Sequence, residues 1–141
     1  MILIVNGPNL NLLGRRQPDI YGDRSFEDYL GELRFRFPSM EFEYLQSNSE
    51  ADIISAIQEH GFSGHCEGIV LNAGGYSHTS VAIADAVAAV PVKVAEVHIS
   101  NIYAREKFRH HSIIAPYAAA HISGAGLEGY SLAVRFLTAQ Y

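Results

Sequence analysis

The sequence of 141 residues has a single cysteine and no excess of positive charge. Cys66 has no second cysteine to pair with, which excludes an internal disulfide framework and suits a reducing compartment. The 15 acidic residues outnumber the 10 basic ones, which gives a formal net charge of −5 at pH 7. Because no basic face is evident, we expect no general affinity for nucleic acid.

Long apolar runs are missing as well. No stretch approaches the roughly 18 apolar residues that a membrane helix requires. The opening run Met1–Val5 is too short for a secretory signal and lacks its basic leader. Since the chain is long enough for one hydrophobic core and too short for two, we expect one domain over residues 1–141. We expect this domain to be cytoplasmic, with no membrane partner.

Strand and helix patterns alternate along the chain. Strands are predicted at Met1–Asn6, Met40–Gln46, Gly68–Asn72, Val92–Ile99 and Ala119–Ser123. Helices are predicted from Ser25 until Pro38 stops the pattern, from Ser49 to a closing Gly61 at the C′ position, from Ser80 to about Val90, and from about Leu127 to Ala139. This alternation predicts a single-domain, flavodoxin-like three-layer α/β fold, with a five-stranded parallel sheet in the order 2-1-3-4-5 and helices on both faces.

Two elements have patterns that say more about their position. Met40–Gln46 alternates polar and apolar residues, which favours an edge strand. The alanine-rich helix Ser80–Val90 is only weakly amphipathic. It is equally compatible with packing on its own sheet and with packing against another subunit.

The segment that follows the first strand, Asn6–Gly22, is long, polar and rich in turn-forming residues. In an open α/β sheet, ligands bind at the loops that leave the carboxyl ends of the strands. This loop carries Arg16 and Tyr21. We therefore interpret about residues 14–24 as a mobile lid that brings charge to a substrate.

Polar residues also gather after other strands. The groups are Asn6, Asn9 and Asn11 after the first, Asn72, Tyr76, Ser77 and His78 after the third, and Glu96, His98, Ser100 and Asn101 at the end of the fourth. Strands one, three and four are neighbours in the predicted order, so these groups should line one crevice. Arg105 and Arg109 lie where they could also reach it.

This set of side chains suits one kind of chemistry. Arginine binds carboxylate or phosphate through paired hydrogen bonds, and histidine can donate a proton near neutral pH. A guanidinium near a tyrosine stabilises the phenolate, and the Arg16…Tyr21 spacing allows that pairing. Asparagine can donate to a developing oxyanion. Together they favour proton abstraction beside a carbonyl, with acid-assisted loss of a leaving group.

Individual residues have simpler interpretations. His98 by itself could equally be a hydrogen-bonded core histidine, and Tyr21 by itself could be an ordinary packed tyrosine. Asp85 lies in an apolar helix, where a carboxylate is either exposed or paired, and a hydrogen bond to another subunit is one option. The neighbouring His110 and His111 would point apart on a helix, so solvent exposure is favoured over metal binding. The remaining histidines, His60, His65 and His121, are interpreted as surface or structural residues.

The segment Gly124–Gly129 matches G-x-G-x-x-G after a strand, as a dinucleotide site would. No further strand with an acidic residue about 20 residues on follows it, so we interpret it as a tight strand-to-helix turn. The P-loop pattern is absent.

Several motifs together resemble one family. They are Asn6–Gly14, Arg16-Gln-Pro18 with Tyr21-Gly22, Leu71–Ser80, Glu96–Asn101, Ala104–Ser112 and Gly129-Tyr130. In this order, and over nearly the whole chain, they resemble the type II 3-dehydroquinases (3-dehydroquinate dehydratases) of the shikimate pathway, which serves aromatic amino-acid biosynthesis. Two features are atypical of that family, Tyr103 and the stretch 117–123.

The resemblance implies reversible dehydration of 3-dehydroquinate to 3-dehydroshikimate by anti elimination through an enolate, without metal or other cofactor. By this resemblance Tyr21 is the proton acceptor, His98 the proton donor and Arg16 the transition-state stabiliser. Asn9 would stabilise the enolate through a bound water, and Glu96 would orient His98.

The resemblance also implies a substrate-binding set and an assembly. The binding residues would be Asn72, His78, Asp85, Ile99, Ser100 and Arg109. Asp85 would reach the site of a neighbouring subunit in a homo-oligomer, a dodecamer built as a tetramer of trimers. Arg105 would belong to the charged surroundings that hold the lid.

Three alternative hypotheses about the function can be tested. A type I dehydroquinase forms a Schiff base on a lysine, but the only lysines, Lys93 and Lys107, have no matching context. A non-catalytic flavodoxin-like module could bind a nucleotide or anion at Gly124–Gly129. A catalytically dead relative could serve as an assembly scaffold, which the presence of the implied catalytic residues disfavours.

Overall fold

The computed structural model describes residues 1–15, 19 and 23–139. In it, five parallel strands form one sheet in the order β2-β1-β3-β4-β5. The strands are β1 (Ile2–Asn6), β2 (Phe42–Gln46), β3 (Gly68–Asn72), β4 (Val94–His98) and β5 (Ala120–Ser123). The predicted α/β fold class and strand order are confirmed, and β2 occupies the edge that its alternating pattern indicated.

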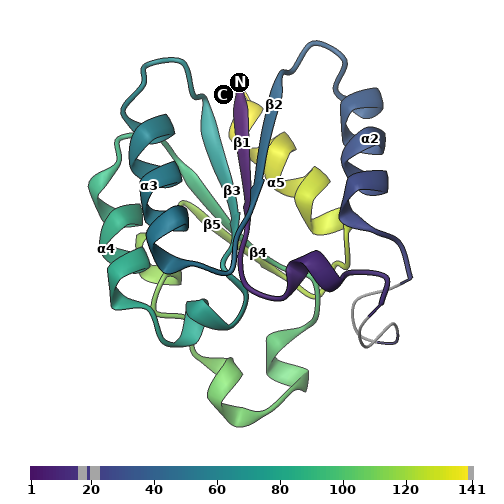
Figure 1. Cartoon of the computed structure of the whole chain (residues 1–141), viewed down its shortest axis with the longest axis vertical. Coiled ribbons are helices and arrows are strands. Elements are labelled where there is room, and N and C mark those ends of the chain that lie inside the picture. The colour runs from purple at the N-terminus through teal and green to yellow at the C-terminus, as the bar shows by residue number, and fades with distance from the viewer. Residues whose placement is uncertain (16–18, 20–22, 140–141) are drawn as a thin grey trace.

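Helices cover both faces of this sheet, as Figure 1 shows. The four α-helices of the described residues are α2 (Phe26–Arg36), α3 (Glu50–Gly61), α4 (Val81–Ala89) and α5 (Glu128–Thr138). Helices α2 and α5 pack on one face, and α3 and α4 on the other. Short 3₁₀ helices, which the sequence analysis did not predict, lie in the connections; they are η1 (Leu10–Leu12), η2 (Gly74–His78), η3 (Ile102–Ala104), η4 (Lys107–His110) and η5 (Ala115–Tyr117).

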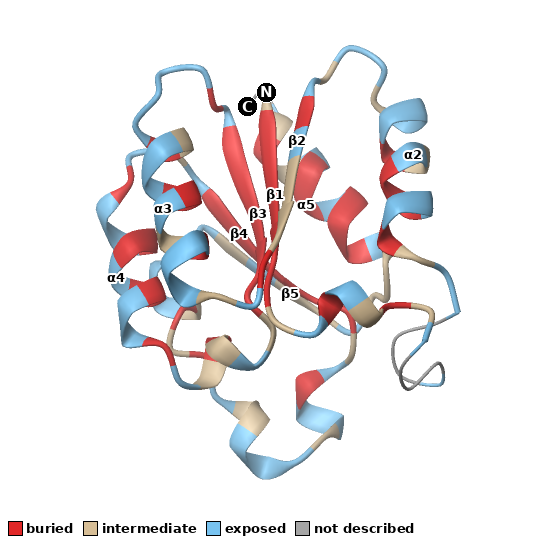
Figure 2. Ribbon diagram, viewed as in Figure 1, coloured by how far each residue is buried: buried red, intermediate tan, exposed pale blue. Residues whose placement is uncertain are grey.

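The central strands are buried from end to end. Every residue of β1, β3 and β4 is buried, whereas β2 and β5 at the edges are partly exposed (Figure 2). A strand covered by helices on both faces has no solvent side, so an uninterrupted apolar run fits it better than alternation. The polar residues Asn6, Asn72, Glu96 and His98 lie within these buried strands and need internal partners.

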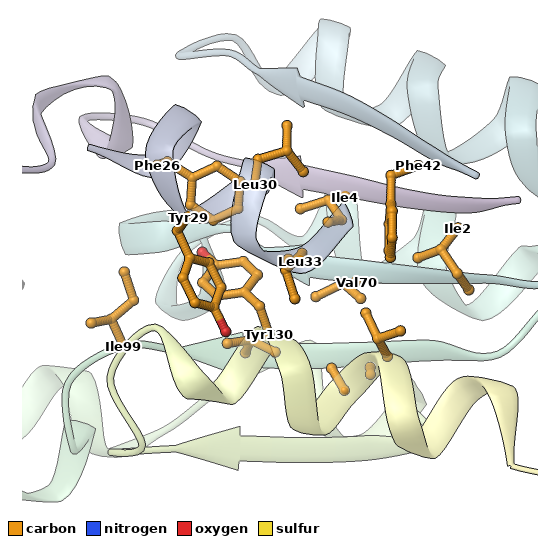
Figure 3. Packing of buried hydrophobic residues seen from close by; sticks show 14 of the residues in the cluster. Ile2, Ile4, Phe26, Tyr29, Leu30, Leu33, Phe42, Val70, Ile99 and Tyr130 are labelled. Atoms are coloured by element: carbon orange, nitrogen blue, oxygen red, sulfur yellow. The ribbon is translucent and has the colours of Figure 1, made fainter. Parts of the chain in front are cut away.

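An aromatic cluster fills the space between α2, α5 and the sheet. Phe26 stacks on Tyr44 with ring centroids 4.8 Å apart, and it lies at the same distance from Tyr130 in a tilted arrangement. Figure 3 shows Phe26, Tyr29 and Tyr130 converging beside the apolar side chains of the sheet. Such pairs add to the free energy gained from apolar burial, and they anchor the first turn of α5 beneath the carboxyl ends of the strands.

Serine residues begin three helices, as their sequence pattern predicted. The hydroxyl oxygens of Ser25, Ser49 and Ser80 each accept a hydrogen bond from the backbone N–H three residues later. The predicted role of Gly61 is wrong in detail. It is the last residue of α3, and Phe62 follows it as the C-cap.

Close packing explains Gly61. A Cβ atom at this position would lie 2.5 Å from Cγ1 of Val90, so glycine allows α3 to approach the end of α4.

Among the described residues, no helix has the length and apolar character needed to cross a bilayer.

Candidate active site

Polar residues that follow β1, β3 and β4 meet in a pocket at one edge of the sheet, as their order along the chain predicted. The pocket walls are Pro8, Asn9, Leu10, Leu12, Leu13, Asn72, Gly74, Gly75, His78, His98, Ile99, Ser100, Ile102, Arg105 and Arg109. Other members of the predicted polar groups do not line it; these are Asn6, Asn11, Tyr76, Ser77, Glu96 and Asn101. The pocket lies beyond the carboxyl ends of adjacent parallel strands, which is where open α/β sheets bind ligands.

Asn9 stands at the entrance of the 3₁₀ helix η1 in a left-handed conformation, with φ of 68°. Among the described residues it is the only non-glycine residue with positive φ. Its N–H donates to Oδ1 of Asn48 at 3.1 Å, and Nε2 of Gln46 donates to the carbonyl oxygen of Gly7 at 3.2 Å. These bonds tie the start of the loop to the end of β2, so that Asn9 is held at the pocket wall.

Glu96 and His98 form a buried pair on β4. Nε2 of His98 lies 2.5 Å from Oε2 of Glu96, whose side chain has no exposure to solvent. Residues two apart on a strand point to the same face, so the strand geometry itself sets this pairing. Ser112 donates its hydroxyl proton to the same carboxylate, with Oγ 2.8 Å from Oε2.

Hydrogen bonding determines the charge of Glu96. Burial alone would raise the pKa of its carboxyl group, but contacts with His121, His98 and Ser112 outweigh burial and lower the pKa to about 2. The group is therefore a carboxylate at neutral pH. It is suited to orient the His98 ring and to stabilise a positive charge on it.

His78 faces His98 across the pocket, with ring centroids 6.1 Å apart and nearly parallel planes. Nδ1 of His78 donates to the carbonyl oxygen of His111 at 2.9 Å. Burial lowers the pKa of His78, so the ring is neutral at pH 7. A neutral ring that donates through Nδ1 has Nε2 available to accept a hydrogen bond from a ligand hydroxyl.

The amide of Asn72 is fixed from behind by a buried network. Nδ2 of Asn72 donates to the Tyr130 hydroxyl at 2.9 Å, and that hydroxyl donates to Oδ1 of Asn6 at 2.7 Å. Oδ1 of Asn72 accepts from the N–H of Gly74 at 3.1 Å. These contacts assign the two ends of the Asn72 amide and hold it at the pocket floor.

Two arginines supply positive charge to the pocket. Nε of Arg109 lies 2.6 Å from Oε2 of Glu106, and its guanidinium lies over the Phe108 ring, 4.8 Å from the centroid. Nη1 of Arg105 donates to Oγ of Ser100 at 3.4 Å. With Ile99 and Ser100 in the adjoining wall, this side of the pocket suits an anionic, hydroxylated ligand.

Comparison with known proteins identifies the family. The Dehydroquinase class II family profile matches residues 1–138. The chain belongs to this family. It is therefore an enzyme, a class II dehydroquinase.

Similar proteins cover almost the whole chain. A 3-dehydroquinate dehydratase from Exiguobacterium sp. is 50% identical over 137 residues, 96% of this chain and 92% of the relative. One from Bacillus subtilis is 49% identical over 141 residues, 98% and 93% of the two chains. The crystal structure of the type II dehydroquinase from Butyrivibrio crossotus superposes with a TM-score of 0.94 at 46% identity, and covers 98% of this chain and 97% of that one.

The candidate residues fall into three groups. Asn9, Asn72, His78, His98, Ile99, Ser100 and Arg109 all line the dehydroquinase pocket, and Glu96 lies directly behind His98. Arg16 and Tyr21, and with them much of the predicted lid, lie outside the described residues. Asp85 is exposed on α4 and does not line the pocket of its own chain.

The structure also bears on two of the alternative hypotheses, nucleotide binding at Gly124–Gly129 and a Schiff-base lysine. In the turn after β5, Gly124 and Gly126 have positive φ and donate their N–H groups to the carbonyl oxygens of His98 and Ile99. Those donors serve the chain itself, which supports the interpretation as a tight turn. Lys93 and Lys107 are exposed, and neither lines the pocket.

The sequence analysis did not identify three residues that support the pocket side chains. Ser112 binds the Glu96 carboxylate, Tyr130 fixes Asn72, and His121, interpreted as a surface or structural residue, places Nδ1 3.4 Å from Oε2 of Glu96. His121 pairs directly with Glu96 across β4 and β5. That pairing is the one signal that could have identified it, and it requires the strand register.

Proposed function

We propose that this dehydroquinase converts 3-dehydroquinate reversibly to 3-dehydroshikimate, in the shikimate pathway, by anti elimination through an enolate. The observation that carries the mechanism is the His98–Glu96 pair at the pocket wall, because it puts a histidine with a buried carboxylate partner where a leaving hydroxyl needs a proton. The family match supports the overall dehydration.

The acid in this scheme is His98. Glu96 occupies Nε2 of the ring, which leaves Nδ1 as the nitrogen available to the substrate. A charged His98 donates the proton from Nδ1 to the C1 hydroxyl as the C–O bond breaks, and water leaves. The Glu96 carboxylate holds the ring plane and stabilises the imidazolium before the transfer.

The base in this scheme is Tyr21, ionised by the neighbouring Arg16, which also stabilises the transition state. Removal of the C2 proton by the phenolate gives the enolate, and Asn9 stabilises the developing oxygen charge through a bound water. The resemblance of the Arg16…Tyr21 motif supports these roles, as does the position of Asn9 on the pocket wall at the base of the same loop. We propose residues 14–24 as the lid that closes over the substrate and excludes water.

The remaining pocket residues bind the substrate. Arg109 pairs with the carboxylate, together with the backbone and side-chain groups of Ile99 and Ser100. His78 accepts from a substrate hydroxyl through Nε2, and Asn72 contacts another hydroxyl with its fixed amide. The orientation of both side chains by internal hydrogen bonds supports this arrangement, because a preset group loses less entropy when it binds.

The functional unit in this proposal is a homo-oligomer, a dodecamer made of four trimers. Asp85 enters the site of a neighbouring subunit there. Its exposure on α4, beside Val81, which is 65% exposed, supports a surface that another subunit covers. A carboxylate among apolar residues on such a surface fits the second of the two options for Asp85, a hydrogen bond to another subunit.

The experiment that tests the function is an absorbance assay. Purified protein, treated with a chelator, is mixed with 3-dehydroquinate, and the conjugated enone of the product is followed in the ultraviolet. A steady rise is expected. No rise from a folded sample would contradict the proposal, and retention of activity after borohydride treatment with substrate would separate it from Schiff-base chemistry.

A further inference from the structure

Glu96, His98 and His121 bring a carboxylate oxygen and two imidazole nitrogens to one point. Glu96 and His98 are two residues apart on β4, and His121 is the direct partner of Glu96 on β5. Paired residues of parallel strands point to the same face, so the backbone alone sets this convergence. The three potential ligand atoms all lie within 4.8 Å of one another.

The geometry is close to that of a transition-metal site. Ligand atoms about 2.0–2.2 Å from a tetrahedral ion lie roughly 3.3–3.6 Å apart. Nδ1 of His121 is already 3.4 Å from Oε2 of Glu96, whereas Nε2 of His98 is 2.5 Å from it across a hydrogen bond. An ion that replaced the proton between Nε2 of His98 and Oε2 of Glu96 would move these two atoms apart by about 1 Å.

The surroundings favour both ligand orientation and access. Ser112 donates to the Glu96 carboxylate, which is the kind of supporting hydrogen bond that holds metal ligands in place. Glu96 is buried, but the His121 side chain is 26% exposed, so an ion can enter from the edge strand without passing through the substrate pocket. Two imidazoles and one carboxylate suit Zn²⁺ and are a poor set for Mg²⁺ or Ca²⁺.

We propose that Glu96, His98 and His121 form a binding site for Zn²⁺, and that the bound ion inhibits the enzyme by occupying the nitrogen of His98 that otherwise pairs with Glu96. The inhibitory part rests on the proposed function of His98. The binding part rests on the geometry alone. The ion has no role in the dehydration itself.

Binding is tested on the intact, chelator-stripped protein by isothermal titration with ZnCl₂. The wild type should take up one Zn²⁺ per chain with a micromolar dissociation constant. His121→Gln removes one of the three ligands at an exposed position and should weaken binding at least about tenfold. His65→Gln, which replaces an exposed histidine far along the chain from the cluster, is the matched control and should bind as the wild type does.

A spectroscopic measurement identifies the ligands directly. Co²⁺ in a nitrogen and oxygen site of low coordination number absorbs visible light more strongly than hydrated Co²⁺ does, so the wild type and His65→Gln should develop these bands and His121→Gln should not. Equal Zn²⁺ affinity in the wild type and His121→Gln would overturn the proposal, as would the absence of binding below millimolar Zn²⁺.

Inhibition is read as the ratio of each variant's rate with Zn²⁺ to its own rate without the ion. The ratio should fall with Zn²⁺ occupancy in the wild type, recover on addition of chelator, and stay near one in His121→Gln over the same range. Stoichiometric binding with an unchanged ratio would overturn the inhibitory part. Absence of dehydration before any Zn²⁺ is added would instead contradict the proposed function, because the titration does not depend on turnover.

Discussion

Nε2 of His98 lies 2.5 Å from Oε2 of Glu96, and the carboxylate has no contact with solvent. Ser112 and His121 also contact this carboxylate. A buried charge with several donors keeps its charge and its position. His98, the proposed acid of the dehydroquinase, is therefore hydrogen-bonded to a carboxylate that Ser112 and His121 also hold in place.

Replacing that partner should slow turnover more than binding. Glu96→Gln keeps the size of the side chain but removes the negative charge that orients and stabilises the His98 imidazolium. We expect kcat to fall by about 10²-fold or more with a much smaller change in KM. Steady-state kinetics on the enone signal measure both constants, with the exposed Glu41→Gln as the control. A wild-type kcat in Glu96→Gln would show that the pair does not serve the acid step.

The loop after β1 should carry the base. Tyr21→Phe and Arg16→Ala are each expected to lower kcat by about 10²- to 10⁴-fold while the circular dichroism spectrum stays unchanged. Arg15→Ala removes a charge from the exposed neighbouring position and should change kcat by less than about threefold. Near-normal turnover in Tyr21→Phe would identify another group as the base.

Asp85 should act between subunits. Asp85→Ala removes a carboxylate that is exposed in the single chain, so the stability of the isolated fold should change by no more than about 0.5 kcal/mol. Either KM should rise, or the oligomer should begin to dissociate at a higher protein concentration than the wild type does. Steady-state kinetics measure KM, and sedimentation velocity over a dilution series measures the assembly. The exposed Glu59→Ala on α3 is the control. Unchanged KM together with unchanged assembly would rule out a role between subunits.

Tyr130 should matter for both stability and substrate binding. Tyr130→Phe keeps the aromatic packing but removes the hydroxyl that accepts from Nδ2 of Asn72 and donates to Oδ1 of Asn6, so each buried amide loses one of its partners. The free energy of unfolding should fall by about 1–3 kcal/mol, and KM should rise because the Asn72 amide is then held only by the N–H of Gly74. Urea unfolding and kinetics check the two effects, against the exposed Tyr103→Phe as the control. An unchanged KM would mean that the Asn72 amide is held without Tyr130.

Two glycine-to-alanine substitutions should have opposite signs. A Cβ atom at Gly7 would lie 2.6 Å from the carbonyl oxygen of Ala73, so Gly7→Ala should lower the free energy of unfolding by about 2 kcal/mol or more. At Gly31, inside α2, a Cβ atom would meet nothing within 4 Å. Gly31→Ala should therefore raise the free energy of unfolding by about 0.5–1 kcal/mol, because alanine loses less backbone entropy in a helix than glycine does. Urea unfolding of both variants measures the difference, and equal shifts would contradict the packing argument at Gly7.

Most of the fold could be predicted because its signals are local. The buried strands appear as apolar runs, and the serine caps precede their helices directly in the sequence. The role of Gly61 was misjudged because a glycine at a helix end has two physical causes, a left-handed C′ residue or a close approach. Only the position of Val90, on another helix end, distinguishes them.

The sequence by itself determined the alternation of strands and helices, which follows from periodicity, and the position of polar residues after β1, β3 and β4, which the parallel direction of the strands brings to one edge. The sheet order was inferred from the likeness of this alternation to flavodoxin-like folds. Only the tertiary structure decided that His121 joins Glu96 and His98, and that Tyr130 fixes Asn72. The physical reason is that a side chain finds distant partners through strand register and helix packing. Both are set by the whole core, and neither can be read from the neighbouring residues in the sequence.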